Sequence, residues 1–109
     1  MSRAVGDKAE ELTCKYLLES GFEIIERNFY SRFGEIDIIA KRGDVLHFIE
    51  VKSGLDFERA VQNLTPTKIG RILKTSDVYL KKHALACNYQ IDAIIVVGES
   101  CEHLESITL

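Results

Sequence analysis

The sequence predicts an α/β fold in which helices cover both faces of one sheet. Residues 35–40 and 45–52 are apolar on both faces of the strands they are expected to form, and such a sheet must be covered on both sides. Apolar residues recur at helical spacing in two other segments, one near the start of the chain and one after residue 65. With 109 residues, the chain has the size of one domain spanning residues 1–109.

The first expected elements are a helix over residues 6–20, ended by Gly21, and a short strand over residues 22–27. Because successive helical residues are about 100° apart, Glu10 falls within the apolar arc of this helix and faces inward. Residues 28–34 connect the short strand to the next one.

The two central strands form a hairpin, because turn residues separate them. A turn centred on residues 42–43 places Asp37 opposite Phe48 and Glu35 opposite Glu50. Alternation then puts apolar side chains on one face: Ile36, Ile38, Val45, Ile49 and Val51. The other face carries Ile39, Leu46 and Phe48 near the turn, and Glu35, Asp37, Glu50 and Lys52 toward the open end.

A loop over residues 53–64 is expected after the hairpin, because this stretch has no periodicity. Thr65 and Pro66 then begin a second helix as its N-cap and first helical residue. A last strand follows over residues 90–97, and residues 106–109 are expected to add an edge strand. The predicted order is helix, three strands, helix, strand.

The charge distribution excludes a simple polycation that coats nucleic acid, because the net charge is −3. Residues 65–83 nevertheless carry five basic residues against one acid, so one element is locally basic. The longest apolar run, residues 93–97, has five residues against the roughly 20 of a membrane-spanning helix, so no membrane partner is expected. Three cysteines, an odd number, suit free thiols in a reducing compartment, and we expect a cytoplasmic protein.

The spacing of Asp37, Glu50 and Lys52 brings two carboxylates and an ammonium group to one face of the hairpin. Mg²⁺ and Mn²⁺ take oxygen ligands, which Asp37, Glu50 and the Val51 carbonyl could supply. Lys52 could orient or activate an attacking water and offset charge at a phosphate. Glu10, on the first helix, could hold a second metal or a metal-bound water.

The plain alternative is a solvated rim of acids and a lysine at a strand end. Three observations favour a site: the strands are otherwise apolar, Glu10 lies in an apolar helical arc, and clustered acids repel unless a cation is present. Glu35 is a supporting acid of the same cluster. Lys68 and Arg71, on the basic helix, contact phosphate or form a solvated helix face, and the sequence leaves both open.

Other residues of ligand type carry weaker signals. A zinc site is not expected, because paired knuckle spacing is absent from the set His83, Cys87, Cys101 and His103. His47 alternates with apolar residues and is expected to be a packed or edge histidine. Asp92 begins the last strand, where it is expected to cap a loop or pair with a basic residue.

Five stretches of the chain resemble a known family: A-E-x-x-x-C-K-Y-L, R-N-F-Y-S-R-F-G-E-I-D-I-I-A, H-F-I-E-V-K-S, T-P-x-K-x-x-R-I-L and Q-I-D-A-I-I-V-V. They are similar to the YraN family of small bacterial proteins, which is placed in the PD-(D/E)XK nuclease superfamily near archaeal Holliday-junction resolvases. The resemblance implies a restriction-endonuclease-like αβββαβ core with a mixed sheet flanked by helices. It also implies a metal site at Asp37, Glu50 and Lys52, with Glu10 as the helical acid.

Two functions follow from the residues and the resemblance. One is a metal-dependent endonuclease, with Mg²⁺ or Mn²⁺, that hydrolyses phosphodiesters of DNA, including branched or irregular DNA. The alternative is an inactive nucleic-acid-binding or assembly module with the same fold. The chain departs from the family pattern at Ala9, where glycine is usual, and near Gly54, where a basic residue is usual. Nucleic acid, DNA first, is the expected partner, and a homodimer stays open.

Overall fold

A computed structural model describes residues 3–108 of the chain, and its side chains from residue 6 onward. Five strands form one sheet in the order β1-β2-β3-β4-β5. Their bounds are β1 Glu23–Ser31, β2 Gly34–Arg42, β3 Val45–Ser53, β4 Asn88–Val97 and β5 Ser100–Leu104. Only the β3–β4 pair is parallel among these neighbours, so the sheet is mixed. The predicted α/β class and helix, three strands, helix, strand order are confirmed.

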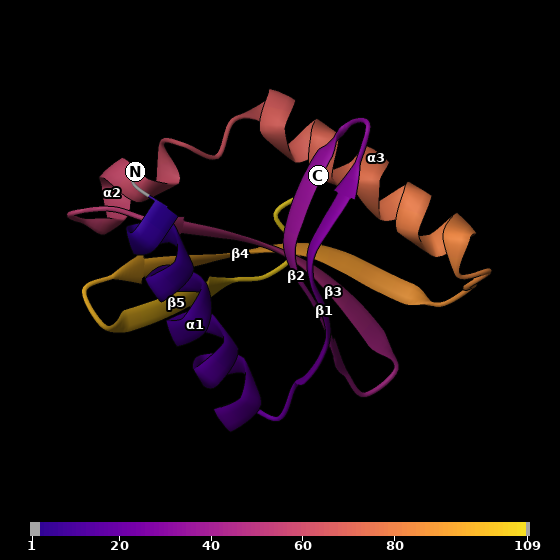
Figure 1. Ribbon diagram of the computed structural model, residues 1–109, viewed down its shortest axis with the longest axis horizontal. Coiled ribbons are helices and arrows are strands. Elements are labelled where there is room, and N and C mark those ends of the chain that lie inside the picture. Colours follow the sequence, from indigo (N-terminus) through magenta and orange to yellow (C-terminus); the bar gives the residue numbers. More distant parts are fainter. Residues whose placement is uncertain (1–2, 109) are drawn as a thin grey trace.

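Helices pack on both faces of this sheet (Figure 1). The first helix, α1 (Arg3–Glu19), covers a cluster of β2, β3 and β4 side chains: Ile38, Ala40, Ile49, Val51, Ile94 and Val96. Two helices, α2 (Phe57–Val61) and α3 (Pro66–Lys82), cover the opposite face. Within residues 3–108, no helix is both long and apolar enough to cross a membrane.

The helix boundaries have local causes. Gly21, at φ +86°, lets the chain turn after α1, and the Phe22 N–H donates to the Leu17 carbonyl at 2.9 Å. The Thr65 hydroxyl accepts the Lys68 N–H at 3.2 Å, which confirms its predicted role as the N-cap of α3.

Two segments expected to be irregular contain regular structure. Residues 53–64 include α2. Asp56 caps the start of this helix, and its side chain accepts the Arg59 N–H at 2.8 Å. Residues 28–31 belong to β1, which continues past the expected end at residue 27. A helix of five residues is too short to show a periodic pattern of apolar residues, which is why α2 was not predicted from the sequence.

The edge strand was expected at residues 106–109, and this prediction is wrong for residues 106–108; residue 109 lies outside the described part. The edge strand is β5, which returns antiparallel to β4 and pairs Ser100 with Val97. Gly98, at φ +60°, permits the tight turn between them. Beyond β5, the Ile107 N–H donates to the Ile91 carbonyl at 2.8 Å and ties the tail to the sheet.

The hairpin register differs by two residues from the prediction. Arg42 pairs with Val45, so the turn consists of residues 43–44, and Phe48 lies opposite Ile39 instead of Asp37. Gly43, at φ +62°, takes the first turn position, where a left-handed backbone is needed. A shift of two residues keeps each β3 side chain on its predicted face.

Two expectations for the start of β2 are also wrong. Glu35 lies opposite Tyr30 of β1 and not Glu50, and Ile36 packs with the α3-facing cluster rather than with Ile38. The cause is that β2 pairs with β3 only from Ile38 onward, so the residues before Ile38 separate from β3. Before that residue, the β1–β2 hairpin rises beside α3 (Figure 1), and Ser31 and Thr75 share a hydroxyl hydrogen bond of 2.8 Å.

Candidate active site

The site lies where β2 and β3 part. Their last backbone pair is Ile38 with Ile49, and the next contact is a hydrogen bond of 2.8 Å from the Val51 N–H to Asp37 Oδ2. The N–H and carbonyl of one residue leave a strand on the same side, so the Val51 carbonyl also faces this gap. The backbone of Val51 and the carboxylate of Asp37 therefore meet at this gap, where both residues are buried.

A pocket of about 210 Å³ opens at this gap. Acids from β2 and β3 and bases from α3 share its lining, which consists of Gly34, Glu35, Asp37, Glu50, Lys68, Arg71 and Ile72. Lys52 lies next to it, with Nζ 2.9 Å from Glu50 Oε1. The fold thus brings together predicted site residues from three elements, and gives Lys68 and Arg71 a position facing the acids.

Glu10 joins the cluster through a residue that the sequence analysis missed. The Asn28 side-chain amide donates to Glu10 Oε1 at 3.2 Å and to Glu35 Oε2 at 3.3 Å. Arg27 holds Glu10 from the other side, with Nη2 3.6 Å from Oε1. Asn28 has φ +53°, a left-handed conformation that asparagine tolerates better than most residues. Because residues 28–34 were expected to be a connection, nothing in the sequence indicated a place for Asn28 in the site.

Burial and neighbouring acids raise the pKa values of two carboxylates in the site. Burial, followed by the charge of Glu50, raises the pKa of Asp37 to about 8, although the Val51 N–H opposes the rise. Burial also raises the pKa of Glu50, against the opposing effect of the Lys52 ammonium. Both shifts mean that burial and the neighbouring acids disfavour the ionised carboxylates. A divalent cation would favour the ionised forms.

A second cluster lies on the α1 side of the sheet. Asp92 is fully buried, and its Oδ2 is 2.5 Å from His47 Nδ1 and 2.7 Å from His103 Nε2. Burial disfavours the charge, but hydrogen bonds from His103, His47, the Ser106 N–H and Gln90 outweigh it and lower the pKa of Asp92 to about 2. With Glu105, these residues form a cluster that could hold a metal ion.

The outcome for the weaker candidates follows from this geometry. His47 is a packed histidine, as expected, and is 3% exposed. Asp92 pairs with His47 and His103 and also accepts the Ser106 N–H at 3.0 Å. Of the four residues considered as a zinc set, His103 lies in the cluster with His47, Asp92 and Glu105. The histidines and the aspartate of this cluster come from three different strands, so no local spacing pattern in the sequence could indicate it.

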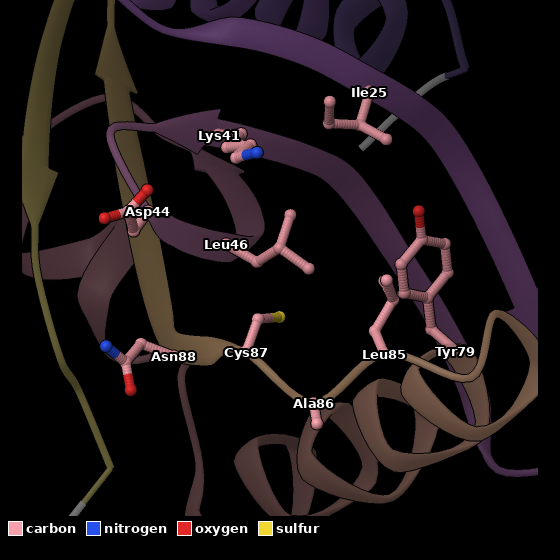
Figure 2. A pocket seen from close by; sticks show the side chains of 9 residues that line it. All are labelled: Ile25, Lys41, Asp44, Leu46, Tyr79, Leu85, Ala86, Cys87 and Asn88. Atoms are coloured by element: carbon pink, nitrogen blue, oxygen red, sulfur yellow. The ribbon is translucent and has the colours of Figure 1, made fainter.

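A larger pocket lies elsewhere. It measures about 830 Å³, and Figure 2 shows Leu46, Tyr79 and Leu85 around it, with Cys87 directed toward its interior. Its lining includes none of the predicted site residues. The smaller pocket, where acids and bases converge, is therefore the candidate active site because of the chemistry of its lining and not because of its size.

Comparison with known proteins identifies relatives along the whole chain. The model of "Uncharacterised protein family UPF0102" matches residues 9–96. A UPF0102 protein of Sulfurimonas denitrificans is 59% identical over 109 residues, covering 100% of both chains. One from Wolinella succinogenes is 51% identical over 109 residues with the same coverage. One from Helicobacter hepaticus is 50% identical over 108 residues, covering 99% of this chain and 97% of the relative.

Proposed function

Because the chain belongs to the UPF0102 family, the YraN family that its motifs resemble, we propose that it is a metal-dependent endonuclease acting on DNA. One observation carries the proposal. The carboxylates of Asp37 and Glu50 share a pocket with Lys68 and Arg71, and Lys52 contacts Glu50 beside it. Hydrolysis of a phosphodiester needs acidic oxygens for a metal and positive groups for the phosphate, and this pocket holds both.

The donor set fits Mg²⁺ or Mn²⁺. Carboxylates of Asp37 and Glu50 and the carbonyl of Val51 would hold the ion, and Glu10 would hold a second ion or an ion-bound water. All of these donors are oxygens, and burial together with neighbouring acids raises the pKa values of Asp37 and Glu50, which an added cation would oppose. When bound, the ion supplies charge for the phosphate oxygens and makes a water more acidic.

The chain's own groups have separate tasks in this proposal. Lys52, held at 2.9 Å by Glu50, orients the attacking water or exchanges a proton with it. Lys68 and Arg71 bind phosphate oxygens, and the planar guanidinium of Arg71 suits two of them at once. Glu35 and Asn28 position Glu10.

A cleavage assay tests the proposal. The purified protein is incubated with linear, nicked and branched DNA, with Mg²⁺ or Mn²⁺ and with EDTA, beside the Asp37→Asn variant. We expect metal-dependent cuts by the parent protein, stronger on branched or irregular DNA, and none by the variant. Binding of these DNAs without any cut would overturn the enzyme and favour the nucleic-acid-binding module.

A further inference from the structure

Side chains from three adjacent strands meet at one carboxylate oxygen. His47 of β3 and His103 of β5 both contact Oδ2 of Asp92 of β4, at 2.5 and 2.7 Å. The other oxygen, Oδ1, accepts the Gln90 amide at 2.9 Å and the Ser106 N–H at 3.0 Å. These two bonds fix the carboxylate so that Oδ2 faces the histidine nitrogens.

A fourth ligand atom lies beside these three. Gln90 also donates to Glu105 Oε1 at 3.2 Å and so links the two carboxylates. One ligand atom from each of the four residues lies within 4.8 Å of the others: His47, Asp92, His103 and Glu105. Imidazole nitrogens suit Zn²⁺ and similar transition-metal ions, which also accept carboxylate oxygens, whereas the candidate active site offers oxygens alone.

The charge of the cluster also favours a cation. Among the ion pairs of residues 6–108, whose side chains the structure describes, Asp92 contacts only the two histidines, although it is fully buried. Arg42 lies 3.6 Å from Glu105 but is half-exposed, so solvent weakens its effect. Four hydrogen bonds already stabilise the Asp92 carboxylate, and a divalent ion between Asp92 and Glu105 would in addition neutralise the charge of both carboxylates.

We propose that His47, Asp92, His103 and Glu105 form a second metal site, for Zn²⁺ or a similar transition-metal ion, that fastens β5 and the tail to the sheet. Ligands of Zn²⁺ lie about 2.0–2.1 Å from the ion and roughly 3.3 Å from one another, so movements below about 1 Å convert the hydrogen-bonded cluster into a coordination shell. Each imidazole then carries its proton on the ring nitrogen that does not bind the ion. Four protein ligands make this a closed, structural site.

The second site is separate from the candidate active site. His47 has the same strand parity as Ile49 and Val51, which pack against α1, whereas Glu50 lines the pocket beside α3. The rings of Phe22 and Tyr16, from the α1 side, contact the histidines with centroid distances of 4.9 Å to His47 and 6.1 Å to His103. The two sites therefore lie on opposite faces of the sheet, and each can be tested without the other.

Zinc calorimetry on the full chain tests the inference, in an Asp37→Asn background that disables the candidate active site. We expect one Zn²⁺ per chain, and more than about 100-fold weaker binding after His103→Gln, since loss of an outer partner alone costs 10–100-fold. Co²⁺ loaded into the same site should give the visible spectrum of a tetrahedral ion. His83→Gln, at an exposed histidine, is the matched control and should bind like its parent.

Glu105→Gln, at a side chain 48% exposed, repeats the test at a position where folding is not at risk, with Glu99→Gln as its control. Unchanged zinc affinity in both His103→Gln and Glu105→Gln would overturn the site and leave a hydrogen-bonded cluster alone. Zinc binding that depends on these residues supports it even if the protein cuts no DNA.

Discussion

Asp37 accepts the backbone N–H of Val51 at 2.8 Å through its side chain. The hydrogen bond takes the place of a ladder bond just past the last β2–β3 pair, Ile38 with Ile49. An acidic residue thus ends the pairing of two central strands, and it lines the same pocket as Glu50. The Asp37 side chain is therefore both a hydrogen-bond partner that links β2 to β3 and a candidate metal ligand.

Protein stability without metal should fall as pH rises. The pKa of Asp37 is raised to about 8 in the folded protein, above its value of about 4 in the unfolded chain, so folding takes up a proton between these values. The unfolding free energy then decreases with pH by on the order of 1 kcal/mol per unit at most within this window. Urea denaturation in EDTA from pH 5 to 8 measures it.

Asp37→Asn is the control for this pH dependence, because its amide oxygen can still accept the Val51 N–H while the titrating group is gone. We expect a flatter pH profile and higher stability than the parent at pH 8 in EDTA. A profile that keeps the parent's slope would place the titrating group elsewhere.

Divalent-ion binding should depend on Glu50. Glu50→Gln keeps the size of a side chain that is 15% exposed and removes one ligand charge, so calorimetry should show strongly weakened Mg²⁺ or Mn²⁺ binding. Glu58→Gln, at an exposed acid on α2, controls for loss of one negative charge. Equal weakening by both variants would reduce the effect to general electrostatics.

The amide of Asn28 should stabilise the acidic cluster. Asn28→Gly keeps the left-handed backbone but leaves Glu10 and Glu35 without the shared donor, so we expect a loss of about 1 kcal/mol in unfolding free energy. Asn28→Ala should lose about 1 kcal/mol more, since its Cβ disfavours φ +53°. Urea denaturation ranks the three proteins. Alanine as stable as glycine would contradict the backbone part of this argument.

The basic residues beside the pocket should set the salt dependence of DNA binding. With Glu10, Glu35, Asp37 and Glu50 inside the site, the rest of a chain with 17 acids and 14 bases is close to neutral. Replacing Lys68 and Arg71 by alanine should reduce the slope of log affinity against log salt by about one to two.

The matched control changes Lys81 and Lys82 to alanine, two bases in the last turn of the same helix. Fluorescence anisotropy at several salt concentrations compares the two double variants. If the control reduces the slope as much as the pocket variant, DNA docks on the other end of α3.

Local patterns in the sequence were sufficient for most elements. The cap at Thr65, the turn at Gly43 and the apolar periodicity of α1 and α3 have causes within a few residues, so these elements were predicted. Strand parity also placed Glu50 and Lys52 on the face that meets α3. The two-residue register error arose because Arg42-Gly43 and Gly43-Asp44 are both acceptable turn pairs on sequence alone.

What could not be predicted depends on contacts between distant segments. The turn of Ile36 toward α3 follows from the parting of β2 and β3, which no single-strand pattern encodes. The parallel register of β3 and β4 brings His47 level with Gln90 and near Asp92, 45 residues away. Asn28 entered the site only because α1 and the β1–β2 hairpin meet there.

The most direct test of the account measures single-turnover DNA cleavage and DNA affinity in the parent protein and in Lys52→Met, which keeps the aliphatic stem and removes the charge. The account predicts metal-dependent cleavage by the parent and a rate lower by about 10²–10⁴ in the variant, the usual cost of losing a positioned acid–base group. DNA affinity should change far less, because one ammonium group makes at most one phosphate contact. Equal cleavage rates in the two proteins, or binding without cleavage by the parent, would contradict it.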